Sequence, residues 1–127
     1  MNVRSIFILL LTLTLNSAAV HGQFAEFLFE EEVHKFPKSQ EGEQLSHTFH
    51  FENTGDAPLI ISRYKVECTC TVASYSKEPI LPGEKGSVLV TFDTNEKFGW
   101  QYRQIDLYAN TKKSPTTLEI RVKVLNE

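Results

Sequence analysis

The feature of this sequence that most constrains its fold is an alternation of apolar and polar residues with a period of two. The alternation is clearest in residues 45–51, 60–66, 88–92, 105–109 and 118–124. Successive side chains of a β-strand point to opposite faces, so each segment predicts a strand with one buried face. We find no segment with the periodicity of a helix.

Turn sequences separate these short segments. In Leu81–Glu84, L-P-G-E, proline presets φ at the second position and Gly83 supplies a positive φ at the third, as a type II turn requires. Short strands at this spacing, in a chain of this length, are typical of two antiparallel sheets packed face to face. The sequence therefore predicts an all-β fold, a single immunoglobulin-like antiparallel β-sandwich of about seven strands.

The N-terminal segment has the pattern of a signal peptide. Arg4 precedes an apolar run, Ile6–Leu15, that is shorter than the roughly 20 residues needed to span a bilayer. Val20–Gly22 provides small residues at the positions before a cleavage site, so we expect cleavage before Gln23. The expected organisation is a signal peptide, 1–22, and one domain, 23–127. The mature chain is predicted to be exported to the periplasm or the extracellular space, with no membrane span.

Charge and motifs argue against several classes of function. The formal net charge is −3 and the charges are scattered, whereas nucleic acids and anionic membranes are bound by basic patches. The sequence lacks the G-x-S-x-G, H-E-x-x-H and G-x-G-x-x-G motifs. We therefore expect neither an enzyme nor nucleic-acid binding. His47 shares a face with Phe49 and is expected at the edge of the core, while His50 points the other way, into solvent.

Both cysteines lie in one short stretch, V-E-C-T-C-T-V. If the strand through Tyr64 continues unbroken, Cys68, Cys70 and Val72 share its inner face and the intervening threonines point outward. Residues two apart in a strand are separated by roughly 6.6 Å, but a disulfide needs Cβ atoms about 3.5–4.5 Å apart. Two packed thiols are therefore the first interpretation. A disulfide remains an alternative, as does a metal or redox site whose cofactor would be copper or zinc.

Three aromatic residues surround a predicted turn at Phe98, Trp100 and Tyr102. The preferred interpretation is that Trp100 closes one end of the sandwich over the core. Alternatively, exposed rings could anchor a partner or stack on a sugar, because tryptophan and tyrosine dominate interface hot spots.

A series of motifs occurs in order along the chain. They are F-x-F-x-N-T-G (49–55), A-P-L-I-I (57–61), C-T-C-T (68–71), P-I-L-P-G-E-K-G (79–86), V-T-F-D-T (90–94) and Y-A-N (108–110). The set resembles a family of short exported bacterial domains of unknown function, common in Bacteroidetes and related in fold to Hydin-type and major-sperm-protein domains. That family shows C-G-C-T where this chain has Thr69. The resemblance implies the fold and export, and it brings no established activity.

The function predicted from these observations is a non-catalytic exported interaction or structural module with a protein partner and no cofactor. One alternative is a thiol-based metal or redox protein that uses Cys68 and Cys70. Another is carbohydrate binding through Phe98, Trp100 and Tyr102. A strand-capping chaperone is a further alternative, supported only by the shared sandwich fold.

The cleavage site can be checked by N-terminal sequencing of the exported protein. Its first residue is expected to be Gln23, because cleavage follows the small residue Gly22. Recovery of an intact Met1 in a membrane fraction would contradict the predicted signal peptide.

Overall fold

The structure is a computed structural model that describes residues 23–126, all of them in strands, turns and loops. The predicted signal peptide, residues 1–22, lies outside the described residues. Within the described part there is no helix that is long and apolar enough to cross a membrane. The strands are β1 (Phe27–Phe29), β2 (Val33–Lys35), β3 (Ser39–Gln40), β4 (Gln44–Asn53), β5 (Ile61–Lys65), β6 (Thr71–Tyr75), β7 (Lys85–Asp93), β8 (Gly99–Ala109) and β9 (Thr116–Leu125).

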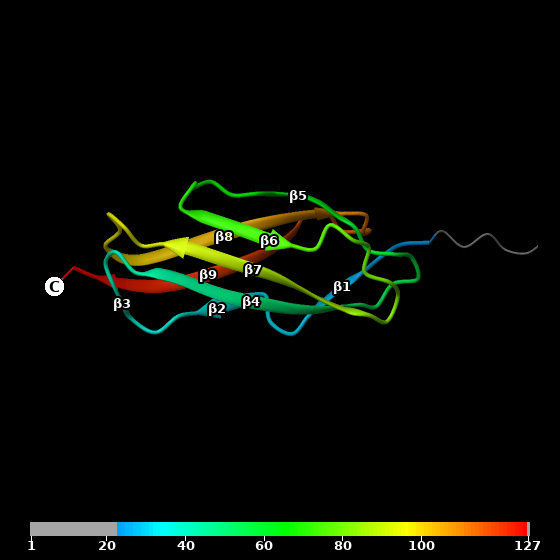
Figure 1. The fold of residues 1–127 in the computed structure, drawn as a ribbon, viewed down its shortest axis with the longest axis horizontal. Helices are drawn as coiled ribbons and strands as arrows, with labels where there is room; N and C mark the ends of the chain where they lie inside the picture. The colour runs from blue at the N-terminus through cyan, green and yellow to red at the C-terminus, as the bar shows by residue number, and fades with distance from the viewer. Residues whose placement is uncertain (1–22, 127) are drawn as a thin grey trace, which may run out of the picture.

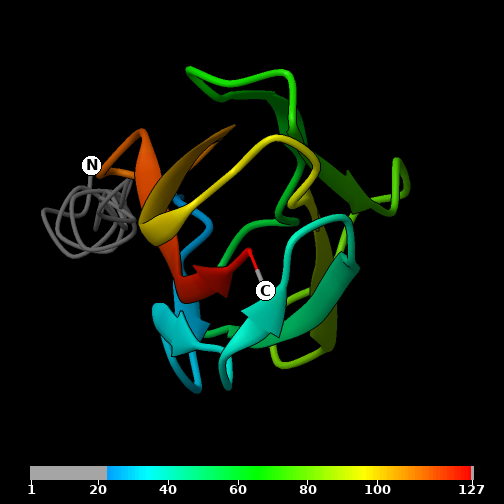
Figure 2. The same ribbon diagram turned by 90° about the vertical axis from the view of Figure 1, so that its left-hand side faces the viewer.

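Two sheets pack face to face, and the predicted all-β, immunoglobulin-like sandwich is confirmed. One sheet has the strand order β1-β4-β7-β6 and the other β2-β9-β8-β5, with β3 also paired to β9. Figure 1 shows the sandwich from the side and Figure 2 looks along its long axis. The strand count exceeds the predicted seven because of β2 and β3, which have only three and two residues. Strands this short are hidden from a period-two pattern, and β2 and β3 run parallel to β9.

Most of the core consists of inward residues of the four long strands, and Ala25, Leu59, Ile61 and Ala73 complete it. Eleven apolar residues of the long strands are fully or almost fully buried, on the face that the alternation predicts. They are Phe49 and Phe51 of β4, Val88, Val90 and Phe92 of β7, Ile105 and Leu107 of β8, and Leu118, Ile120, Val122 and Val124 of β9. Full burial of one such side chain contributes about 1.5–3 kcal/mol, so this layer drives the association of the two sheets.

The alternation predicted for residues 60–66 is wrong at its start. Ile61, not Ile60, faces the core, since Ile61 is 6% exposed and Ile60 is 45% exposed. A β-bulge between Ile61 and Arg63 then shifts the pattern by one residue, so that Tyr64 packs against the core as predicted. A bulge adds one residue to a strand and thereby exchanges its two faces.

Asn53, the polar residue of F-x-F-x-N-T-G, ties three loops together at one end of the sandwich. Its fully buried side chain donates to the carbonyl oxygens of Ala57 at 2.8 Å and Ile80 at 2.9 Å. Its Oδ1 accepts from the backbone N–H groups of Glu26 at 3.2 Å and Gly55 at 3.0 Å. One amide therefore bonds to four backbone groups outside the named strands, of which the Ile80 carbonyl also accepts from the Leu59 N–H.

Polar residues of two other motifs also bond to loop backbone. In Y-A-N, Asn110 accepts from the Ile60 N–H and donates to the Pro58 carbonyl, both at 2.8 Å. In V-T-F-D-T, the Thr94 hydroxyl donates to the Glu43 carbonyl at 2.7 Å. Asn53 and Thr94 lie at opposite ends of β7. The motifs thus provide both the core and the side chains that hold the turns.

Replacing Asn53 by alanine is expected to lower the free energy of unfolding by about 2–4 kcal/mol, because a fully buried amide is lost together with its four hydrogen bonds to partly buried backbone groups. Denaturant unfolding of the two proteins measures the difference. The matched control is Asn95→Ala at an exposed turn, which should change stability by less than about 0.5 kcal/mol. Equal effects of the two substitutions would contradict the role given to Asn53.

Candidate functional site

The two cysteines are joined in a disulfide, so the first interpretation, two packed thiols, is wrong. Strand β5 ends at Lys65, and the chain turns at Cys68–Cys70 instead of staying extended. The turn is closed by a bond from the Thr71 N–H to the Cys68 carbonyl at 3.1 Å, and the two Cα atoms are 5.1 Å apart. The expectation failed because it assumed an unbroken strand through Thr69.

This turn also changes which residues of β6 face the core. Thr71, expected on the outer face, is 2% exposed, and Val72, expected inside, is 48% exposed. Ala73 continues the buried face. The described residues include no free cysteine, and a thiol–metal site at Cys68 and Cys70 would therefore require reduction first.

Trp100 and Tyr102 lie exposed on the outer face of β8, so Trp100 does not close the end of the sandwich. The two side chains are 47% and 55% exposed. Their rings are stacked, with centroids 6.2 Å apart and planes inclined by 22°. Both residues are out of step with the buried Ile105 and Leu107 of the same strand. They form one exposed aromatic surface.

Three cations from β2 and β9 lie beside this pair. The Lys35 ammonium lies 5.1 Å from the centre of the Trp100 ring, and the Arg121 guanidinium lies 5.8 Å from that of Tyr102. Lys123 is paired in register with Trp100. We call these five residues the β8 aromatic face. Although Glu119 pairs with Arg121, the face is positive in a chain whose net charge is −3.

The structure separates Phe98 from the other two predicted aromatics. Phe98 is 56% exposed and lines a hollow with Gln40 and Leu125 where strands end. Among the described residues, no ring contact joins Phe98 to Trp100 or Tyr102. Cys68, by contrast, lines the same surface hollow as Tyr102. Cys68 and Tyr102 therefore line one hollow, and Phe98 lines another.

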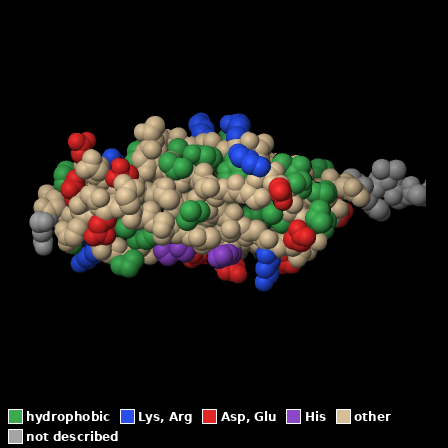
Figure 3. Space-filling view, viewed as in Figure 1, with side chains coloured by type: hydrophobic (Ala, Val, Ile, Leu, Met, Phe, Trp, Pro, Cys, Tyr) green, Lys and Arg blue, Asp and Glu red, His purple; other side chains and the backbone are tan. Residues whose placement is uncertain are grey.

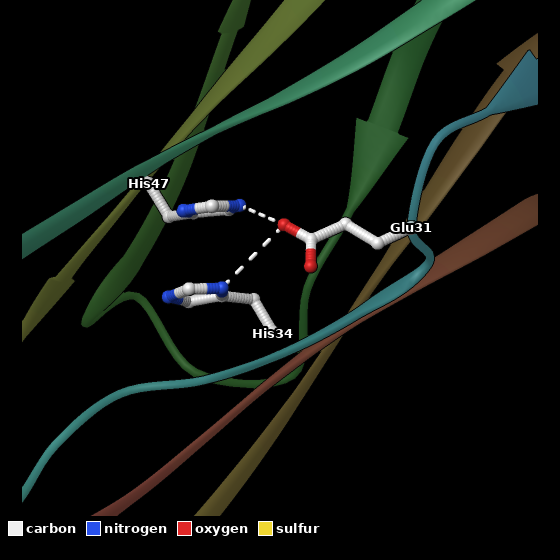
Figure 4. A group of neighbouring side chains, drawn as sticks. All are labelled: Glu31, His34 and His47. Carbon is white, nitrogen blue, oxygen red and sulfur yellow. Dashed lines mark hydrogen bonds and ion pairs between the residues drawn. The ribbon is translucent and has the colours of Figure 1, made fainter.

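A group that the sequence did not predict consists of Glu31, His34 and His47 (Figure 4). Glu31 lies in the crossover from β1 to β2, His34 is in β2, and His47 is in β4 of the opposite sheet. The imidazole rings stack with centroids 3.4 Å apart and planes inclined by 7°. Glu31 Oε1 is 3.4 Å from His34 Nδ1 and forms a close hydrogen bond with His47 Nε2. Figure 3 shows histidine side chains beside acidic ones along one edge of the molecule.

Two phenylalanine rings hold the histidines in place. Phe36 meets the His34 ring edge to face at 4.7 Å, and the buried Phe49 meets the His47 ring in the same way at 4.8 Å. Burial, reinforced by the neighbouring His47, holds the pKa of His34 below its ordinary value of 6.5, and Glu31 opposes this shift only in part. The neutral imidazole of His34 is therefore favoured at neutral pH.

The expected positions of His47 at the edge of the core and His50 in solvent are confirmed. The only local signal for the cluster was the spacing of Glu31 and His34, three residues apart. His47 comes from a strand of the other sheet, and a period-two pattern carries no information about contacts between sheets.

Residues 27–124 match the model of a protein family described as protein of unknown function (DUF1573), and the chain belongs to this family. The predicted resemblance to a family of unknown function with an immunoglobulin-like fold is thus confirmed. No curated protein matches the chain.

Solved structures resemble the chain at low sequence identity. One is a Porphyromonas gingivalis protein of unknown function (TM-score 0.66, 15% identity, 85% of this chain and 51% of that chain). Another is PapD-like domain 7 of human CEP192 (0.63, 12%, 87% and 92%). A third is the VesB protease of Vibrio cholerae (0.59, 15%, 77% and 31%). The chain spans about half the length of the Porphyromonas protein. These likenesses show the fold.

Titration of thiols in the purified exported protein tests the disulfide. We expect no reactive thiol after unfolding in denaturant without reductant, and two after reduction, because Cys68 and Cys70 are bonded to each other. Two thiols that react on unfolding alone would instead restore the interpretation of packed thiols.

Proposed function

We propose that this protein is an exported, non-catalytic immunoglobulin-like module that binds a protein partner through the β8 aromatic face. The observation that carries the proposal is the stacked, exposed pair of Trp100 and Tyr102. Tryptophan and tyrosine in one rigid patch are the residue types that provide most of the binding energy at protein interfaces. The β8 aromatic face therefore has the composition of an interface before any partner is present.

The charges of this face indicate the chemistry of the partner. Lys35 and Arg121 rest against the two rings, and Lys123 lies opposite Trp100. Interfaces bring complementary potentials together, and like charges in contact are unfavourable. We infer that the partner presents acidic side chains beside an apolar contact.

Two observations support export. The apolar run Ile6–Leu15 after Arg4 has the pattern of a signal peptide. The Cys68–Cys70 disulfide suits an oxidising compartment, because disulfides persist in the periplasm and outside the cell. We propose that the mature domain is residues 23–127 and that it acts in one of these compartments.

We propose from the fold and the sequence motifs together that the protein is not an enzyme. The family has no described function, and the chain carries none of the enzyme motifs considered above. The VesB protease is more than three times as long as the part that the chain matches, so its activity is not transferred to this domain.

A second candidate function is carbohydrate binding by the same two rings. Near-parallel, exposed aromatic rings offer a flat apolar platform on which the C–H face of a sugar ring can stack, with Lys35 and Arg121 available for hydroxyl or acidic groups. Phe98 does not contribute to this platform.

Affinity purification of the tagged full chain from the exported fraction tests the proposal. The double variant Trp100→Ala, Tyr102→Ala is expected to bind a captured partner at least about tenfold more weakly, because hot-spot aromatics are lost. The matched control is Val72→Ala, Leu89→Ala, which removes two exposed apolar residues from the outer face of the opposite sheet. That variant should retain the partner.

The same variants separate the two candidate functions. A partner captured equally by the Trp100→Ala, Tyr102→Ala variant and the wild type would contradict the assignment of the binding face. On a glycan array, binding that disappears in this variant would favour the sugar, and an array without signal would exclude the glycans on it.

A further inference from the structure

The cluster of Glu31, His34 and His47 lies at a seam that neither sheet covers. His34 belongs to an edge strand of one sheet, β2, and His47 to β4 of the other. Glu31 reaches the two rings from the crossover that connects the sheets (Figure 4). His34 and His47 thus join two strands, β2 and β4, that are not paired with each other.

The geometry of the cluster provides three metal ligands in one place. His34 Nδ1, His47 Nε2 and a Glu31 carboxylate oxygen lie within 4.8 Å of one another. Two ligands of a tetrahedral zinc ion are about 3.3 Å apart, since Zn–N and Zn–O bonds are about 2.0–2.2 Å long. The 3.4 Å between His34 Nδ1 and Glu31 Oε1 already has this value. To admit an ion, the stacked rings need to splay, so that both nitrogen lone pairs point to it.

We propose that Glu31, His34 and His47 bind a divalent transition-metal ion that links β2 of one sheet to β4 of the other. Two imidazoles and one carboxylate suit Zn²⁺ and Cu²⁺. Ca²⁺ and Mg²⁺ prefer oxygen ligands alone, and Cu(I) prefers sulfur. The site shares no residue with the β8 aromatic face or with the cysteine pair.

The surroundings of the cluster favour a defined site over a chance encounter of surface groups. Phe36 and Phe49 restrict the two imidazoles by edge-to-face contacts, so little ring freedom is lost when the rings splay to bind an ion. The rings are half-buried and the carboxylate is exposed, which leaves the solvent side open for a water as the fourth ligand. An ion can also enter from that side.

The test uses the full exported protein, stripped with a chelator and titrated with ZnCl₂ and, separately, CuCl₂ by isothermal calorimetry. We expect one equivalent of ion and a melting temperature that rises with its concentration, because the ion binds the folded state. CaCl₂ and MgCl₂ should have no such effect. Substitution of the ion by Co²⁺ should give visible absorption bands from nitrogen and oxygen ligands.

Matched variants locate the site. His34→Gln and His47→Gln should each weaken binding by more than about tenfold, since a direct ligand is lost. His50→Gln, on the opposite face of β4, should bind like the wild type. Glu31→Gln should weaken binding while its neighbour Glu32→Gln does not; both positions are exposed, so folding is preserved. If a histidine variant fails to fold, the comparison of Glu31→Gln with Glu32→Gln still decides the test.

Two results would overturn the proposal. The first is a failure of the wild-type protein to bind either Zn²⁺ or Cu²⁺. The cluster would then be a hydrogen-bonded contact between the sheets. The other is binding that His50→Gln or Glu32→Gln reduces as much as His47→Gln or Glu31→Gln, which would mean adventitious binding to surface groups.

Discussion

The arrangement of the loops around the sandwich depends on the buried amide of Asn53. Hydrophobic burial is non-directional and would tolerate many paths for the connections between strands. Asn53 removes this freedom, because its side chain bonds to backbone before β1, in the β4–β5 crossover and in the β6–β7 connection. Its own backbone accepts from the Gly83 N–H at 2.8 Å and donates to the Glu84 carbonyl at 2.9 Å. One residue at the end of β4 thereby places the turn that begins β7 and the crossover to the second sheet.

The parts of the fold that could be predicted are those in which neighbouring residues contain all the information. The faces of β4, β7, β8 and β9 follow from alternation, since each strand is long and uninterrupted. Between Ile60 and Val72 the predicted faces were partly wrong. An assignment by alternation is displaced by any inserted residue. A bulge after Ile61 and a turn at Cys68–Cys70 each shift the count, and the error reaches Val72. Both features interrupt the backbone pairing between strands. The pattern of apolar and polar side chains gives no sign of such an interruption.

The candidate sites differ in how far the sequence could reveal them. The exposure of Trp100 and Tyr102 could be predicted from the alternation, because both lie on the opposite face of the strand from Ile105. The interpretation that Trp100 closes one end of the sandwich did not take this alternation into account. The sequence could not predict the cluster of Glu31, His34 and His47. The cluster depends on how the two sheets are stacked and on the short strand β2. Contacts of this kind arise from tertiary packing alone.

The short strand β2 links the two proposed sites. His34 points to the histidine cluster, and the next residue, Lys35, lies over the Trp100 ring on the outer face. With only three residues at the edge of its sheet, β2 has little backbone pairing of its own to fix its position. An ion that holds His34 against His47 would also hold the backbone that carries Lys35. By thermodynamic linkage, a partner that contacts Lys35 would then raise the affinity of the cluster for the ion by the same factor as the ion raises the affinity for the partner.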